Sequence, residues 1–129
     1  MKHIRKFKES LNINITELQN FCNDNLAYLI DDGFKVKCTS HRTFKESGYY
    51  SRVGINKPYN IYNWYDVRDD IIPFISTLSK EYNILPYVYF YISTEAGHRD
   101  KMIKLDDIVN DRLENYEIVS SITFRIEKY

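Results

Sequence analysis

The chain has 129 residues, among them 12 tyrosines, two cysteines, 18 basic and 18 acidic residues. This length fits one domain with one core and excludes two independent cores. The cancelling charges point to neither nucleic acid nor a membrane as partner, and no apolar run approaches the roughly 20 residues of a membrane span. We therefore expect a flexible leader over residues 1–12 and a single soluble, cytosolic domain over residues 13–129, with reduced thiols.

The first predicted element is a helix that begins near Ile15. Asn14 and Glu17 have the spacing of a capping box, and Gly33 can adopt the left-handed conformation that closes a helix. Apolar residues recur between them at helical spacing: Leu18, Phe21, Cys22, Leu26 and Leu29. This face is expected to be buried.

The next segment alternates apolar and polar residues from Phe34 to Thr39, which is typical of a strand with one buried face. Cys38 then points toward the core, as Cys22 does. Both are expected to act as apolar fillers rather than as a disulfide. Residues 40–48 are predicted to form a loop.

Residues 50–56 and 59–64 are predicted to be strand, broken at Pro58 because proline has no N–H to donate, in a hairpin whose register the sequence leaves open. A second helix is predicted over residues 66–82. Pro73 leaves its start open between two alternatives. Either Asp66 caps the helix and Pro73 bends it, or Asp69 caps the helix and Pro73 lies in the first turns.

Residues 86–93 are the clearest predicted strand, because Val88, Phe90 and Ile92 alternate with three tyrosines. The following segment, Ser-Thr-Glu-Ala-Gly-His-Arg-Asp-Lys, is predicted to be a loop. A short helix over residues 105–113 and a final strand complete the chain. The inward side of that last strand is expected to consist of Ile118, Ile122, Phe124 and Ile126.

These elements follow the order α-β-β-α-β-α-β, which predicts an α+β fold. We expect a two-layer α/β sandwich, in which an antiparallel or mixed sheet of about four strands carries its helices mainly on one face.

The sheet face opposite the predicted core is the first candidate functional surface. Its expected residues are Tyr87, Tyr89, Tyr91, Lys35, Lys37, Tyr50, Arg52 and Arg125. Aromatic rings interleaved with cations can stack bases and neutralise phosphates, as in modules that bind RNA or single-stranded DNA. The same residue types anchor protein interfaces, a homo-oligomer included. Two purely structural explanations compete: another element covers this face, or its cross-strand pairs only stabilise a solvated sheet.

The second candidate is a catalytic or nucleotide-binding site at Glu95, His98 and Asp100, with His41 as a further member. Such a site requires these residues to converge within hydrogen-bond reach. Their spacing matches no established metal motif, and the sequence has no Gly-rich phosphate loop and no nucleophile elbow. No catalytic residue, metal or cofactor is therefore predicted.

The first nine residues, Met-Lys-His-Ile-Arg-Lys-Phe-Lys-Glu, resemble the capsid-targeting start of small internal and accessory proteins of large tailed bacteriophages. In that family a prohead protease removes the leader after a glutamate, which here would be Glu9. The resemblance implies a protein packaged with phage DNA and delivered into the host, where family members counter restriction or other defence.

The leading hypothesis from the sequence is thus a non-enzymatic phage accessory protein that binds and blocks a host macromolecule, in the first place a protein of a defence system. Its expected location is the host cytoplasm, with carriage in the virion as an option. The alternatives are binding of RNA or single-stranded DNA through the tyrosine-rich face, and a small enzyme or nucleotide-binding protein at residues 95–100.

Overall fold

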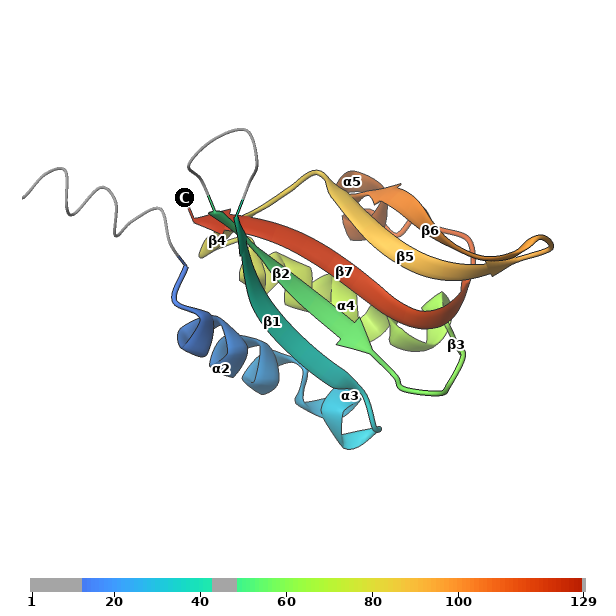
Figure 1. Ribbon diagram of the computed structural model, residues 1–129, viewed down its shortest axis with the longest axis horizontal. Helices are drawn as coiled ribbons and strands as arrows, with labels where there is room; N and C mark the ends of the chain where they lie inside the picture. Colours follow the sequence, from blue (N-terminus) through green and yellow to red (C-terminus); the bar gives the residue numbers. More distant parts are fainter. Residues whose placement is uncertain (1–12, 43–48, 129) are drawn as a thin grey trace, which may run out of the picture.

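The computed structural model describes residues 13–42 and 49–128 (Figure 1). The predicted leader, its cleavage after Glu9 and most of the predicted loop at 40–48 lie outside these residues. The described chain is mixed α+β. Its elements are α2 (Ile15–Asn25), α3 (Ala27–Asp31), β1 (Lys35–Arg42), β2 (Tyr49–Asn56), β3 (Tyr62–Asn63), α4 (Trp64–Leu78), β4 (Tyr82–Ile84), β5 (Tyr87–Thr94), β6 (Gly97–Lys104), α5 (Leu105–Val109) and β7 (Glu117–Lys128).

The strands form one antiparallel sheet, in the order β1-β2-β7-β5-β6, and the short strands β3 and β4 also pair with β7. The sheet is antiparallel, one of the two predicted alternatives, but the predicted number of about four strands is wrong. Seven strands occur in the described residues: β4 and β6 are not among the predicted elements, and β3 is a short separate strand within the predicted segment 59–64. The long strand β7 runs through the middle of the sheet, drawn in red in Figure 1.

The core lies on one face of the sheet, where alternate strand residues pack against the helices. Its largest fully buried side chains include Trp64 and Phe74 from α4, Phe90 from β5 and Phe124 from β7. Figure 1 shows α4 passing behind β2 and β7. All the inward residues predicted for β5 and β7 are buried, which confirms the predicted alternation of these two strands.

The first helix begins as predicted, because the side chain of Asn14 accepts a hydrogen bond from the Glu17 N–H across 3.1 Å. The helix is not continuous, however. Leu26 has φ −118° and ψ 24°, outside helical values, and separates α2 from α3. Gly33 follows with φ +94°, so the predicted left-handed position is confirmed.

The second helix begins earlier than predicted, at Trp64, so neither Asp66 nor Asp69 caps it. Its first turn is capped from a distant segment, because Tyr65 N–H donates to Oδ1 of Asn115 at 3.0 Å. Pro73 lies inside the helix, where its missing N–H leaves a backbone carbonyl one turn earlier without its usual donor. Residues 79–82 are outside the helix, and Tyr82 begins β4.

The strand predicted over residues 50–56 is confirmed as β2, but the strand predicted over residues 59–64 is largely wrong. Strand β2 forms an antiparallel hairpin with β1, in a register that sets His41 opposite Tyr50 and Lys37 opposite Gly54. Only Tyr62 and Asn63 of the later segment form a strand, and they pair with β7. Tyr59 has φ +61°, which no strand residue adopts.

The predicted loop after β5 is also wrong, since the chain turns at Glu95 and Ala96 and returns as the edge strand β6. Gly97 takes φ +118° at the turn, and its carbonyl accepts from the Thr94 hydroxyl at 2.8 Å. The predicted helix at 105–113 is shorter and ends at Val109, although Leu113 is buried as expected.

The side chain of Gln19 occupies part of the free hydrogen-bonding edge of strand β1. Its amide group donates to the Val36 carbonyl and accepts from the Cys38 N–H, both at 2.9 Å. The amide thus makes the pair of bonds that a neighbouring strand would make. Open strand edges are sites of unwanted pairing, so this contact fastens α2 to the sheet and protects its edge.

Replacing Gln19 by alanine is expected to lower the free energy of unfolding by about 1–2 kcal/mol, because two hydrogen bonds to the backbone are lost. Urea unfolding followed by the fluorescence of Trp64, the one tryptophan of the chain, measures this change. Asn20→Ala, at an exposed position of the same helix, is the matched control and should stay within about 0.5 kcal/mol. Equal effects of the two variants would contradict the role of Gln19.

Candidate functional site

The sheet face opposite the core, called the open face below, carries all eight residues predicted for it. The alternation of β1, β2, β5 and β7 directs their side chains away from the buried residues. Tyr87 is 41% exposed, and the two lysines of β1 are exposed. The remaining five are half-buried: Tyr50, Arg52, Tyr89, Tyr91 and Arg125. The described helices all contribute to the core on the other side of the sheet. Among the described residues, therefore, no helix covers the open face, as the first of the two structural explanations would require.

Arginines and tyrosines interlock at the centre of the open face. Arg52 of β2 lies directly opposite Arg125 of β7. The guanidinium of Arg125 lies over two rings, 5.4 Å from the centre of Tyr50 and 4.8 Å from that of Tyr89. Arg52 lies 5.7 Å from the Tyr50 ring and donates from Nη2 to its hydroxyl at 3.2 Å. These distances are typical of cation–π contacts, which orient the planar guanidinium groups.

The arginine pair, Arg52 and Arg125, has no acidic partner within the part of the chain that the structure describes. The ion pairs found there involve Lys57, Arg68 and Arg112 instead. The Nε atoms of both members of the pair are buried and lack a hydrogen-bond acceptor. A buried donor without a partner costs about 1–3 kcal/mol, so the position of these two Nε groups is unfavourable for stability.

A shallow hollow of about 180 Å³ lies beside the arginine pair, and Tyr89, Thr123 and Asp100 line it as well. Thr123 of β7, which lies opposite Tyr89 of β5, contributes a small side chain to its lining. The hollow therefore exposes the arginines from the side.

His41 adds to the same face from β1. Its ring stacks on Tyr50, with 5.4 Å between ring centres and 19° between planes, and Nε2 lies 2.9 Å from the Thr39 hydroxyl. Desolvation lowers the pKa of His41 first, and the positive charges of Arg52 and Arg125 lower it further. The two arginines thus disfavour a positive charge on the imidazole beside them.

The residues predicted for a catalytic site do not converge. His41 is on β1 and His98 is on β6, the two opposite edge strands of the sheet. Four strand spacings of about 4.8 Å separate them by roughly 19 Å, far beyond hydrogen-bond reach. His98 packs instead against the ring edge of Tyr91, with 6.0 Å between ring centres. Within residues 13–42 and 49–128, no three His, Cys, Asp or Glu side chains are grouped to hold a metal ion.

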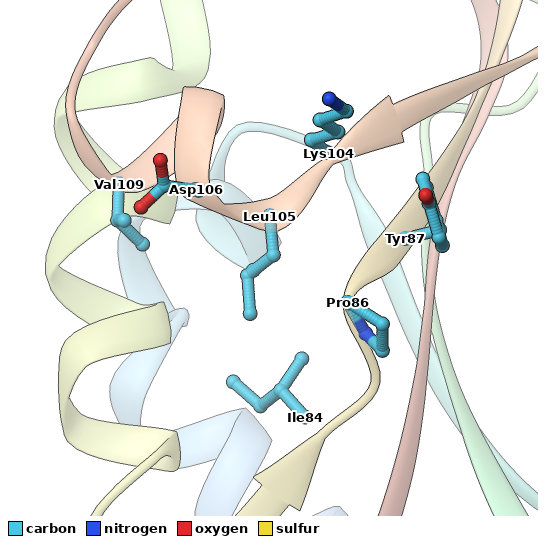
Figure 2. A pocket seen from close by; sticks show the side chains of 7 residues that line it. All are labelled: Ile84, Pro86, Tyr87, Lys104, Leu105, Asp106 and Val109. Atoms are coloured by element: carbon cyan, nitrogen blue, oxygen red, sulfur yellow. The ribbon is translucent and has the colours of Figure 1, made fainter.

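A separate, mostly apolar hollow of about 360 Å³ lies between the β4–β5 connection and α5 (Figure 2). Figure 2 shows Ile84 and Leu105 facing one another across it, while Lys104 points away. Its ionisable lining residues, Tyr87, Lys104 and Asp106, stand apart from one another at its rim in Figure 2. This hollow therefore offers mainly apolar contact.

The sequence analysis missed two further residues of the open face, His41 and Asp100. His41 lies in the predicted loop 40–48, although continued alternation from Lys35 through Thr39 extends the strand to it. Asp100 lies on β6, a strand that the sequence did not predict, opposite Tyr91.

No protein-family model matches the chain, and neither the curated proteins nor the solved structures contain a match. None of the described helices is long and apolar enough to cross a membrane. The arrangement of residues on the open face is therefore the basis for assigning a function.

Proposed function

We propose that the open face binds single-stranded nucleic acid, with the arginine pair holding a backbone phosphate. The observation that carries this proposal is the pair of adjacent arginines whose charges form no ion pair among the described residues. A phosphate presents several oxygens at once and accepts bidentate bonds from guanidinium groups. It would offset the two adjacent positive charges.

The layout of the other cations favours a chain of phosphates over one small anion. On the neighbouring strand β1, Thr39 pairs with Arg52, and Lys37 lies two residues further along β1, a distance of about 7 Å in the strand direction. Lys35 lies about 7 Å beyond Lys37 on the same strand. The cations therefore follow a line from the arginine pair toward one end of β1. A polymer that runs along this line contacts all four charges in turn.

The tyrosines divide into two roles under this proposal. Tyr50 and Tyr89 support the guanidinium of Arg125, so their faces are partly occupied. Tyr87 and Tyr91 have no cation over their rings among the described residues, and they flank Tyr89 on β5. They are the residues on which bases would stack, which favours unpaired strands over a duplex.

The proposal predicts binding of a fluorescently labelled single-stranded RNA or DNA of about 12 nucleotides, within the site sizes usual for such domains. Anisotropy titrations should show log K falling with log salt at a slope of about −3, since each of four phosphate contacts contributes about −0.7. A duplex of the same length should bind more weakly. Affinity that is undetectable, or unchanged between about 50 and 200 mM salt, would rule the proposal out.

The hypothesis of a phage accessory protein that blocks a host defence protein stays a prediction, because its motif lies in residues 1–9, outside the described residues. An acidic protein surface could also satisfy the arginine pair, because carboxylates accept the same bidentate bonds. The same titration distinguishes the two partners. Preference for a poly-glutamate peptide over oligonucleotides, at equal ionic strength, would overturn the nucleic-acid proposal and assign the face to an acidic protein.

A further inference from the structure

The two cysteines meet in the core between α2 and β1. Cys22 is 0% and Cys38 is 6% exposed, both are free thiols, and a hydrogen bond joins their sulfur atoms across 3.7 Å. The chain has two cysteines in total, so neither has another intramolecular partner. They belong to elements that Gln19 already holds together, and they lie on the core side of the sheet, away from the arginine pair.

We propose that Cys22 and Cys38 form a reversible dithiol–disulfide site that reacts with peroxide-class oxidants and locks α2 onto β1. The sulfur atoms need to approach from 3.7 Å to about 2 Å, a shift that side-chain rotation and a small movement of α2 can supply. The site is independent of the proposed nucleic-acid binding.

The two thiols have unequal roles in the reaction. Cys38 lies on the edge strand β1 and is 6% exposed, whereas Cys22 on α2 is 0% exposed. An oxidant that enters at this edge therefore reaches Cys38 first. Cys38 is the residue that attacks the oxidant, as its thiolate, and Cys22 is the resolving thiol.

The reaction balances with hydrogen peroxide as the two-electron oxidant. The Cys38 thiolate attacks one peroxide oxygen, the O–O bond breaks, and Cys38 becomes a sulfenic acid while the released hydroxide takes a proton to form water. The Cys22 sulfur then attacks the Cys38 sulfur, loses its proton and expels a second water. Two thiols and one peroxide thus yield one disulfide and two waters.

Access of the peroxide is provided by the position of the pair at the edge of the fold. Strand β1 is an edge strand, and α2 is the element that covers this part of it. Elements at an edge open locally at a lower free-energy cost than the centre of a sheet. The reaction is therefore expected to be slower than for an exposed thiol but to occur in the folded protein.

The test exposes the folded full-length protein to hydrogen peroxide and then alkylates the remaining thiols in denaturant with iodoacetamide. Intact mass should show the loss of two hydrogens and no alkylation, and dithiothreitol should restore two alkylatable thiols. The melting temperature of the oxidised protein should rise by about 10 °C, because the cross-link closes a loop of roughly 15 residues.

Cys22→Ala is the control variant, because Cys38 then lacks its resolving partner. It should gain oxygen atoms or form an intermolecular dimer, and it should never lose two hydrogens within one chain. The proposal is overturned if the wild-type protein keeps two alkylatable thiols after peroxide treatment, gains oxygen instead, or forms only intermolecular disulfides.

Discussion

The double variant Arg52→Ala/Arg125→Ala is expected to bind single-stranded oligonucleotides about 100-fold or more weakly than the wild-type protein. Each arginine would contribute charge-assisted hydrogen bonds to phosphate, and such bonds are worth about 1.5–3 kcal/mol each. The salt dependence should flatten at the same time, by about 1.4 in the slope of log K against log salt. Anisotropy titrations at several salt concentrations measure both quantities.

The matched control is Arg68→Ala/Arg112→Ala, which changes the net charge equally. Both of these arginines pair with aspartates away from the open face, at 3.4 Å to Asp111 and Asp106. The control should bind oligonucleotides almost as tightly as the wild-type protein. Equal losses of affinity in the two double variants would mean that net charge alone explains the effect, which would contradict a specific site. Replacing the arginine pair by lysines should restore only part of the affinity, because lysine keeps the charge but loses the bidentate geometry.

Stability separates a binding role from a structural role for the arginine pair. Like charges directly opposite one another on neighbouring strands are unfavourable, so the double variant should unfold at a urea concentration no lower than that of the wild-type protein. A large loss of stability would instead assign the pair to the fold.

Replacing Phe90 by alanine is expected to lower the free energy of unfolding by about 3–5 kcal/mol, a large share of the 5–15 kcal/mol usual for a domain. Phe90 is 0% exposed and lies between two rings, 5.3 Å from that of Trp64 and 6.2 Å from that of Tyr116 between centres. Its removal leaves a cavity that neither ring can fill without moving away from its other contacts. Urea unfolding monitored by circular dichroism measures the change.

Tyr28→Ala is the matched control for this large-to-small substitution, because its ring is 83% exposed on α3. It should change the free energy of unfolding by no more than about 0.5 kcal/mol. Tryptophan emission adds a second readout for Phe90→Ala, since the cavity adjoins Trp64. A loss below about 1 kcal/mol would mean that the core relaxes around the missing ring.

Several elements were predictable because their signals are local. The inward side of β5 follows from strict alternation of Val88, Phe90 and Ile92 with tyrosines, and the start of α2 follows from Asn14. Other boundaries depend on distant residues. The start of α4 is capped by Asn115, which lies 50 positions away and leaves no mark in the local sequence.

Strand β6 was missed for a different reason. It is an edge strand with Ile103 as its buried residue, and charged side chains occupy its middle. Charges on an edge strand discourage pairing with other chains, but they also erase the apolar alternation by which strands are recognised. The pairing of Asp100 with Tyr91 could therefore not be foreseen.

Most members of the candidate surface were predictable from the sequence, but their geometry was not. Alternation alone determines that Tyr50, Arg52, Tyr89 and Arg125 face away from the core, because neighbouring residues of a strand point to opposite sides. Which of them touch depends on strand order and register. Placing β7 between β2 and β5 brings Arg125 between Tyr50 and Tyr89 and sets it opposite Arg52.

The sequence by itself thus determined which residues of β5 and β7 enter the core and which face outward, since that choice follows from periodicity over a few residues. Only the tertiary structure decided that two arginines meet without a described acidic partner and that two cysteines lie 3.7 Å apart. Both juxtapositions join segments distant in the chain, and pairings of this kind are set by the packing of the whole sheet against its helices rather than by any local pattern.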